Sequence, residues 1–176
     1  MGTGIRFTKK NSSAGSLVGL ADANYSNSAV TKKTTSGFVA TLYGNPISWS
    51  TKKQAIVAQL TTEAEFVAIN KCAEQLRWLS MLLTSIGLET GIPTILNDNR
   101  GAVFITEEAK LNWNSKHIEI RFQYVRNMVR RQLLNIAHAP LTAMISDILT
   151  KPLGTVELNE LKRLLNMFKM VHVKGE

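Results

Sequence analysis

The sequence has only one cysteine, Cys72, so it can form no internal disulfide and no metal cluster built from several cysteines. No apolar run approaches the roughly 20 residues that a membrane-spanning helix needs. The first residues lack the basic-then-apolar pattern of a secretory signal. The 176 residues are enough for one domain with its own core. We therefore expect one domain without a membrane span, in a reducing compartment, with the Cys72 thiol buried on a helix.

Acidic residues are also scarce relative to basic ones. The chain has 21 lysines and arginines against 13 aspartates and glutamates, which gives a formal net charge of +8 and a pI near 9.8. Such an excess favours a polyanionic partner, because phosphates attract the cations and release their counterions on binding. From charge alone, a basic protein without such a partner is an equally good interpretation.

The order of apolar patterns predicts an α/β fold with a mixed sheet. Three short strands, joined by turns, are expected to form an antiparallel meander at residues 15–25, 36–43 and 47–50. A long amphipathic helix is expected from Thr61 or Thr62 to Gly87, after a basic loop at 51–54. The later elements are strands at 93–96 and 133–137 and helices at 99–106, 116–131, 142–150 and 156–170.

Aspartate occurs three times, at Asp22, Asp98 and Asp147, and each lies at the edge of a predicted element. Asp22 and Asp98 end apolar strands, where ligand sites of open α/β sheets lie. Glu65 on the long helix and Asp147 on a later helix could reach the same edge. Four clustered carboxylates would repel one another unless cations neutralised them, and oxygen ligands suit Mg²⁺ or Mn²⁺. Two such ions would support phosphodiester hydrolysis.

Each carboxylate also has a purely structural explanation. Asp22 could be a turn residue, and Asp98 could be the N-cap of the helix that follows it. Glu65 has the spacing of a capping box with Thr62. Asp147 could face solvent on its helix. Composition and spacing are compatible with either explanation for each carboxylate.

Seven segments, in this order along the chain, resemble the ribonuclease H domain of copia-type retrotransposon polyproteins. They are GLADANY (19–25), TSGF (35–38), ISWSTKKQ (47–54), TTEAEFVA (61–68), NDN (97–99), SKHIEIR (115–121) and SDILTKPL (146–153). The resemblance covers about residues 4–153. It implies a ribonuclease H-like fold, with a five-stranded mixed sheet flanked by helices. Residues 1–15 would be a linker or the tail of an upstream connection region, in which residues 5–7 could form a short strand. Residues 16–153 would be the domain and 154–176 a C-terminal helical extension.

The resemblance also implies an activity, namely metal-dependent cleavage of the RNA strand of RNA–DNA hybrids during reverse transcription. It assigns two ions of Mg²⁺ or Mn²⁺ to Asp22, Glu65, Asp98 and Asp147, and it matches Glu65 rather than Glu63 to the family's glutamate. His138 corresponds to a histidine that assists product release in related cellular enzymes. The resemblance further implies an upstream reverse transcriptase in the same polyprotein and a cytoplasmic location in virus-like particles.

The sequence departs from the family's usual pattern at two positions. Asn24 stands where a second aspartate is usual, and Asn97 stands where a cysteine is usual. Neither change removes an implied metal ligand. Because hybrids are read through backbone shape and 2′-hydroxyls, the expected contacts are polar and basic residues beside the site. They are Lys32, Lys33, Thr34, Thr35, Ser36, Lys52, Lys53, Arg100, Lys116 and His117.

Two other functions are alternatives to the nuclease. A catalytically silent nucleic-acid-binding domain of the same fold, either connection-type or domesticated, would have no need to keep four carboxylates. An integrase or transposase would carry its acidic residues in the order Asp, Asp, Glu, whereas the glutamate here lies between Asp22 and Asp98. The order therefore disfavours strand transfer.

Overall fold

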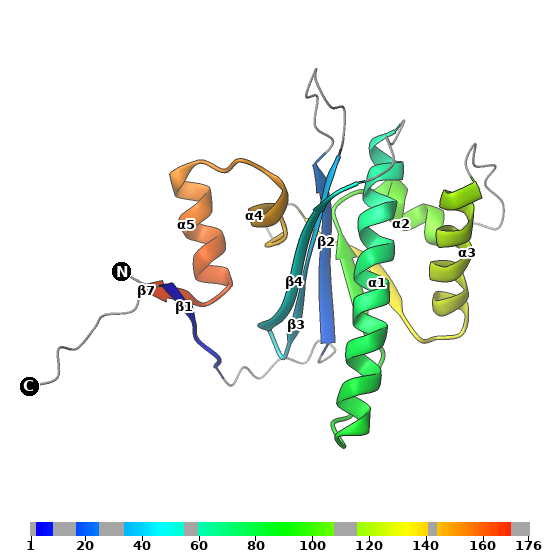
Figure 1. Cartoon of the computed structure of the whole chain (residues 1–176), viewed down its shortest axis with the longest axis horizontal. Coiled ribbons are helices and arrows are strands. Elements are labelled where there is room, and N and C mark those ends of the chain that lie inside the picture. Colours follow the sequence, from blue (N-terminus) through cyan, green and yellow to red (C-terminus); the bar gives the residue numbers. More distant parts are fainter. Residues whose placement is uncertain are drawn as a thin grey trace, which may run out of the picture.

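A five-stranded sheet forms the centre of the computed structural model, which describes residues 3–8, 17–24, 34–54, 60–107, 116–140 and 144–169 (Figure 1). The strand order is β4-β3-β2-β5-β6. Its strands are β2 (Leu17–Asn24), β3 (Thr35–Leu42), β4 (Asn45–Lys53), β5 (Thr94–Asn97) and β6 (Asn135–His138). β2, β3 and β4 pair antiparallel, whereas β5 pairs parallel with both β2 and β6. The predicted meander and mixed sheet are confirmed.

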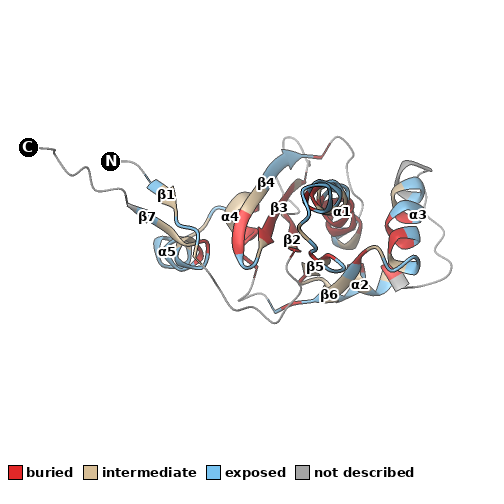
Figure 2. Cartoon of the chain, turned by 90° about the horizontal axis from the view of Figure 1, so that it is seen from below, coloured by how far each residue is buried: buried red, intermediate tan, exposed pale blue. Residues whose placement is uncertain are grey.

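Helices cover both faces of this sheet. On one side lie α1 (Thr61–Ser85), α2 (Arg100–Glu107) and α3 (Lys116–Arg130), and on the other lie α4 (Asp147–Thr150) and α5 (Thr155–Leu164) (Figures 1 and 2). Two separate apolar clusters result, one under α1 and α3 and one under α4 and α5. None of the helices in the described ranges has the length and apolar character required to span a membrane.

The side chains of β2 alternate between the two clusters. Leu17 and Ala21 belong to the α1 side, whereas Leu20 belongs to the α5 side. Gly19 lets α1 approach closely, because a Cβ atom there would lie 2.3 Å from the Cys72 Sγ atom. Cys72 is fully buried on α1, as predicted, and burial raises the pKa of its thiol far above the usual range. This thiol is therefore unsuited to act as a nucleophile.

The last helix is shorter than the apolar pattern predicts. The expected helix at 156–170 ends at Leu164, and Asn166 then takes a left-handed backbone conformation, with φ of 54°. The chain continues as β7 (Met167–Lys169), which pairs antiparallel with β1 (Thr3–Ile5) in a separate two-stranded sheet. The N-terminal strand expected at 5–7 thus lies at 3–5. Helical periodicity could not reveal this pairing, because its partner lies more than 160 residues away.

β4 is longer than predicted, since it runs to Lys53 rather than ending at residue 50. Lys52 and Lys53 therefore lie on a strand, paired with Ser36 and Thr35 of β3, and not in a loop. This part of β4 is exposed and polar. The hydrogen-bonded ladder extends the strand where the apolar pattern stops.

Candidate metal centre

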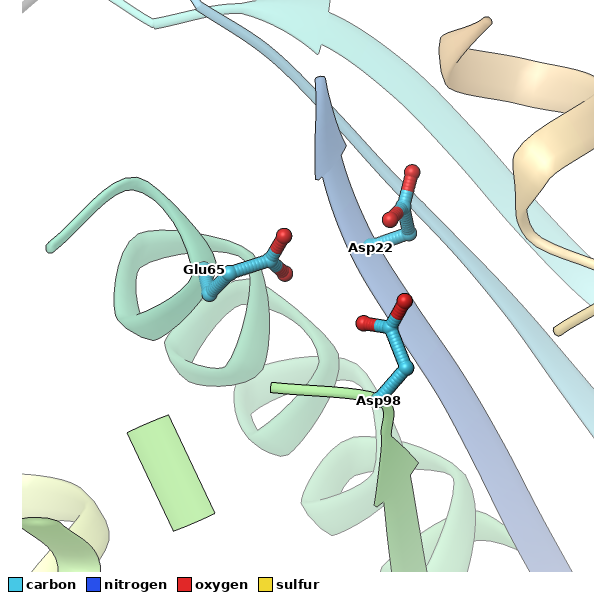
Figure 3. A group of neighbouring side chains, drawn as sticks. All are labelled: Asp22, Glu65 and Asp98. Carbon is cyan, nitrogen blue, oxygen red and sulfur yellow. The ribbon is translucent and has the colours of Figure 1, made fainter. Parts of the chain in front are cut away.

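Three carboxylates meet at one edge of the central sheet. Asp22 lies near the end of β2, Asp98 directly follows β5, and Glu65 lies one turn into α1 (Figure 3). One oxygen of each carboxylate lies within 4.8 Å of an oxygen of both others. The parallel pairing of β2 with β5 brings their carboxyl ends together, and α1 crosses the same edge. Among the described residues, this group contains Glu65 and not Glu63.

The structure does not support the capping explanations for Glu65 and Asp98. The N-cap residue of α1 is Leu60, which makes no side-chain capping bond, and neither Thr61 nor Thr62 is that residue. At α2, the Asn99 Oδ1 atom accepts the hydrogen bond from the Ala102 N–H, at 2.9 Å. Glu65 Oε2 instead accepts a hydrogen bond from the Ala23 N–H of β2, at 3.1 Å. The Glu65 carboxylate is thus tied to the sheet and not to the start of its own helix.

Asn97 orients the Glu65 side chain. Its amide nitrogen donates to Glu65 Oε2 at 3.0 Å and to the Ala21 carbonyl at 2.9 Å, while its Oδ1 accepts from the Asn99 N–H at 3.0 Å. Asn97 is fully buried. Sequence reasoning treated Asn97 only as a departure from the usual cysteine, yet it connects β2, β5 and α1 at the centre of the site.

The electrostatics of the group favour a bound proton or cation. The pKa of Glu65 is raised to about 8, chiefly by burial, and the negative charges of Asp22 and Asp98 act in the same direction. The hydrogen bond from Asn97 and the positive charge of Lys151 act in the opposite direction. Buried carboxylates that repel one another in this way are suited to a divalent ion with oxygen ligands.

Asp147 lies outside the group of three but is coupled to it through Lys151. The Lys151 Nζ atom is 3.0 Å from Asp147 Oδ1 and 3.3 Å from Asp22 Oδ1. Only 4% of Asp147 is exposed, so it does not face solvent. The pKa of Asp147 is raised to about 6, chiefly by burial, although the hydrogen bond from Lys151 acts in the opposite direction. The fourth carboxylate thus adjoins the other three with a lysine between it and Asp22.

Curated relatives align with most of this chain. The Retrovirus-related Pol polyprotein from transposon RE2 of Arabidopsis thaliana is 31% identical over 165 residues, covering 93% of this chain and 11% of that protein. The corresponding polyprotein from transposon RE1 of the same plant is 34% identical over 149 residues, covering 84% of this chain and 10% of that protein. The chain therefore spans about a tenth of the length of these relatives. No protein-family model matches the chain.

Solved structures share the fold. LC11-RNase H1 in complex with an RNA/DNA hybrid superimposes with a TM-score of 0.57 at 16% identity, over 76% of this chain and 93% of that one. A foamy viral protease-reverse transcriptase, also with an RNA/DNA hybrid, gives 0.56 at 12% identity, over 77% of this chain and 19% of that one. The chain belongs to the copia-type retrotransposon ribonuclease H domains.

In this ribonuclease H domain, the short helix α4 is anchored to the sheet by three hydrogen bonds. Thr150 Oγ1 donates to Asp22 Oδ2, Asn24 Nδ2 donates to the Thr150 carbonyl at 3.1 Å, and Thr51 Oγ1 donates to the Leu149 carbonyl at 2.7 Å. Asn24, the other departure from the family pattern, thus holds α4 in place. An aspartate there could not donate this bond.

Gly37 allows α4 to approach β3 closely. It lies opposite Asp22 in the β2–β3 register, and a Cβ atom there would be 2.7 Å from Thr150 Cγ2 and 3.0 Å from Leu149 Cβ. Sequence reasoning did not single out Gly37, Thr150 or Lys151, although all three lie within the family motifs. The available signal for Lys151 was its spacing of four residues from Asp147, which favours an ion pair on a helix.

The remaining predicted site residues are distributed around the domain. His138 ends β6, rather than lying in a loop, and is exposed beside Asn97 in the strand register. Lys52, Lys53 and Arg100 are exposed. Lys32 and Lys33 lie outside the described residues, as do the side chains of Lys116 and His117.

The hydroxyl residues nominated for hybrid contacts are less accessible. Thr34 and Ser36 are buried, and Thr35 is half-buried. The Gln54 amide donates to Ser36 Oγ at 2.6 Å and to the Ala64 carbonyl at 2.9 Å. These contacts tie β3 to the start of α1, so Ser36 supports the region beside the carboxylates.

A basic hollow of about 250 Å³ lies next to these residues, between β3, β4, α1 and α3. Its lining includes Ser36 and Gln54 together with four cations: Lys52, Lys53, Lys71 and Arg121. Lys71 also makes an exposed ion pair with Glu74 at 2.7 Å. A concave surface with this charge is suited to a phosphate-bearing ligand.

Proposed function

We propose that this domain is an active ribonuclease H, a metal-dependent endonuclease that hydrolyses the RNA strand of RNA–DNA hybrids. One observation supports this above all others: the oxygens of Asp22, Glu65 and Asp98 lie within 4.8 Å of one another at the carboxyl end of parallel strands. The three come from positions up to 76 residues apart. Their convergence is energetically unfavourable without a cation, which argues that the site is maintained for one.

The donor set matches a divalent ion with oxygen ligands. In the proposed site, Asp22, Glu65 and Asp98 would hold one Mg²⁺ or Mn²⁺, and Asp22 with Asp147 would hold a second. Bound there, the ions would supply an activated water and stabilise the charge that develops on the leaving oxygen. Asn97 keeps the Glu65 carboxylate directed at the site, and Thr150 does the same for Asp22.

The proposed substrate follows from the charge around the carboxylates. Lys52, Lys53, Lys71 and Arg121 line the basic hollow, and a hybrid could place backbone phosphates there. Further proposed contacts are Arg100 on α2 and Lys116 and His117 on α3. Lys32 and Lys33, between β2 and β3, and Thr35 at the start of β3 are also proposed contacts. We assign His138 a proposed role in product release, because its side chain is exposed and it pairs in register with Asn97, the residue before Asp98.

A second function is favoured by one specific observation. Lys151 already neutralises part of the charge between Asp22 and Asp147. A domain that had lost catalysis could keep its carboxylates in this way and serve only to bind nucleic acid. The buried hydrogen bonds from Asn97 and Ala23 to Glu65 argue for the enzyme, since a binding domain would gain nothing from holding this carboxylate beside Asp22 and Asp98.

The deciding experiment is cleavage of a labelled RNA–DNA hybrid by the purified domain with Mg²⁺, Mn²⁺ or EDTA. Single-stranded RNA and duplex DNA serve as control substrates. We expect metal-dependent cutting of RNA in the hybrid alone, and its loss in Asp22→Asn and Asp98→Asn with the fold and hybrid binding preserved. Glu63→Gln should remain active, whereas Glu65→Gln should not. Cleavage by Asp22→Asn would contradict the site.

If no hybrid is cut, either the domain needs a neighbouring reverse transcriptase or it only binds nucleic acid. A further experiment separates these two explanations. We propose that the domain works beside a reverse transcriptase of the same polyprotein, within virus-like particles. If the isolated domain binds hybrid in a salt-sensitive way without cutting it, the reverse transcriptase is added in cis. Restored cleavage would support the enzyme, and continued inactivity would support the binding function.

A further inference from the structure

Among the residues that the structure describes, Lys151 is the cation that forms ion pairs with carboxylates of the proposed metal centre. Its ammonium contacts two carboxylates on different elements, Asp22 on β2 at 3.3 Å and Asp147 on α4 at 3.0 Å. Both carboxylates are almost completely buried, whereas 29% of the Lys151 side chain is exposed. The ammonium thus lies between two buried negative charges, on a side chain that is partly exposed to solvent.

We propose that Lys151 is a built-in counter-ion of the metal-free site: its ammonium occupies the place between Asp22 and Asp147, and a divalent ion can enter that place only when the ammonium withdraws. This inference rests on the proposed function, which assigns the same carboxylates to metal. It adds that the two metal places are unequal. Among the described residues, neither Glu65 nor Asp98 forms an ion pair with a lysine. The metal place between Asp22 and Asp147, in contrast, is already occupied by the Lys151 ammonium.

The backbone fixes where the lysine stem begins. Lys151 is the C-cap of α4, with an extended backbone (φ −116°, ψ 144°) and its N–H bonded to the Asp147 carbonyl. Pro152 follows, and a proline disfavours helical backbone at the residue before it. α4 itself is held to the sheet by Asn24, Thr51 and Thr150. The α4 position therefore does not depend on the Lys151 ion pairs alone.

The side chain, in contrast, can leave its place. A lysine stem has four flexible carbons, and its ammonium is readily hydrated once it reaches water. Since part of the Lys151 side chain is already exposed, withdrawal requires rotation of the stem and no movement of α4. A divalent ion then brings two positive charges where the ammonium had one, which compensates the buried carboxylates more completely.

An alternative role for Lys151 is purely structural, as an ion pair that fastens α4 to β2. The two roles predict different responses to metal. If Lys151 has only this structural role, Lys151→Met lowers the free energy of unfolding equally with and without metal. The affinity for metal is then unchanged or lower. If Lys151 is a counter-ion, Lys151→Met lowers the free energy of unfolding of the metal-free domain but raises the affinity for metal at Asp147.

The test is a calorimetric titration with Mn²⁺ alone, without nucleic acid, on the full chain and on Lys151→Met. Lys71→Met is the matched control, since Lys71 forms an exposed ion pair with Glu74. We expect the wild-type domain to bind one ion more tightly than a second. Lys151→Met should tighten the weaker site by about tenfold, and Lys71→Met should leave both Mn²⁺ affinities unchanged. Unchanged or weaker binding in Lys151→Met would overturn the inference.

A measurement on the wild-type chain keeps the test independent of the variant's folding. Acylation of lysines, followed by mass spectrometry of peptides, reports how accessible each ammonium is. Labelling of Lys151 should rise at saturating Mn²⁺, whereas labelling of Lys71 should stay constant. Constant or lower labelling of Lys151 while Mn²⁺ is bound would contradict withdrawal.

The outcomes also distinguish this inference from the proposed function. If neither protein binds Mn²⁺, the metal centre is wrong and both proposals fail. If Mn²⁺ binds with the expected effect of Lys151→Met but no hybrid is cut, the counter-ion role stands and the nuclease activity does not. If hybrid is cut and Lys151→Met leaves the Mn²⁺ titration unchanged, only the counter-ion role fails.

Discussion

The Asn97 amide, at the end of β5, donates a 3.0 Å hydrogen bond to the Glu65 carboxylate on α1. The same amide nitrogen also bonds the Ala21 carbonyl on β2. One buried side chain thus fixes the distance between the sheet and the helix at the point where the carboxylates meet. This arrangement makes Asn97 a positioning residue for the site, although it is not itself an acid.

Replacing Asn97 should therefore change both stability and metal binding. Asn97→Ala leaves a buried carbonyl and carboxylate without this donor, which should lower the free energy of unfolding by about 1–3 kcal/mol. Because the lost bond favours the charged form of Glu65, the pKa of Glu65 should rise above its present value of about 8. Mn²⁺ titrations at several pH values should then show binding shifted to higher pH.

Asn70→Ala is the matched control for this prediction. Asn70 is buried on α1 and donates to Glu74, away from the carboxylates. It should also destabilise the domain, but the pH dependence of Mn²⁺ binding should stay that of the wild type. An equal shift in both variants would mean that general destabilisation, and not the contact to Glu65, sets the pH dependence.

Glu65→Gln should make the metal-free domain more stable at neutral and mildly alkaline pH. The folded-state pKa of about 8 lies above the ordinary value of 4.5, so between these values the folded protein keeps a proton that the unfolded chain has released. Stability from this group is therefore present at low pH and is lost as pH rises toward 8. In EDTA, the variant should unfold at a higher temperature than the wild type at pH 8, and the difference should shrink toward pH 5.

Glu63→Gln provides the comparison for that measurement. Glu63 lies on the same helix but outside the group of three carboxylates. Its substitution should not reproduce the higher unfolding temperature that Glu65→Gln shows at pH 8 in EDTA. If Glu65→Gln is no more stable than the wild type at pH 8, the Glu65 carboxyl does not hold a proton there.

Gly37→Ala should displace α4 and with it Asp147. The added Cβ would lie 2.7 Å from Thr150 Cγ2, so the helix must move or the strand must shift. Overpacking of this kind costs about 1–3 kcal/mol of stability in a well-packed core. Hybrid cleavage should fall even under conditions where urea unfolding shows that the variant is still folded. The nuclease assay and the urea titration measure the two effects separately.

Gly154→Ala is a suitable control, because nothing lies within 4 Å of a Cβ atom at Gly154. Its φ of −66° is also open to alanine. Because alanine is a poorer N-cap residue than glycine, the free energy of unfolding should fall by about 1 kcal/mol, while hybrid cleavage should stay that of the wild type. Full cleavage by Gly37→Ala would show that the close approach of α4 to β3 is not needed for the site.

Lys52→Ala with Lys53→Ala should weaken hybrid binding through lost phosphate contacts. Both lysines are exposed on β4 and line the basic hollow. Each lost contact should reduce the slope of log affinity against log salt by about 0.7–0.9. Fluorescence anisotropy with a labelled hybrid at several salt concentrations measures this slope. Arg163→Ala on α5, across the sheet, should leave it unchanged.

Much of the fold could be predicted because its signals are local. The apolar runs of β2 and β3, the turn between β3 and β4, and the helical period of α1 and α3 each lie within a short stretch of sequence. Asp22 and Asp98 were expected at strand ends because apolar runs stop there. The extra length of β4 and the pair formed by β1 and β7 were missed, since both depend on a partner strand and not on a local pattern.

The scarcity of aspartate and the spacing of the motifs were enough to identify the candidate carboxylates. It took the folded chain to reveal that Glu65 joins Asp22 and Asp98 rather than capping its helix, that Asn97 holds it there, and that Lys151 lies between Asp22 and Asp147. These contacts join strands to helices that are distant in the sequence, so no local pattern encodes them. Burial of both faces of the sheet fixes the register of the elements, and that register sets the distances between their polar groups.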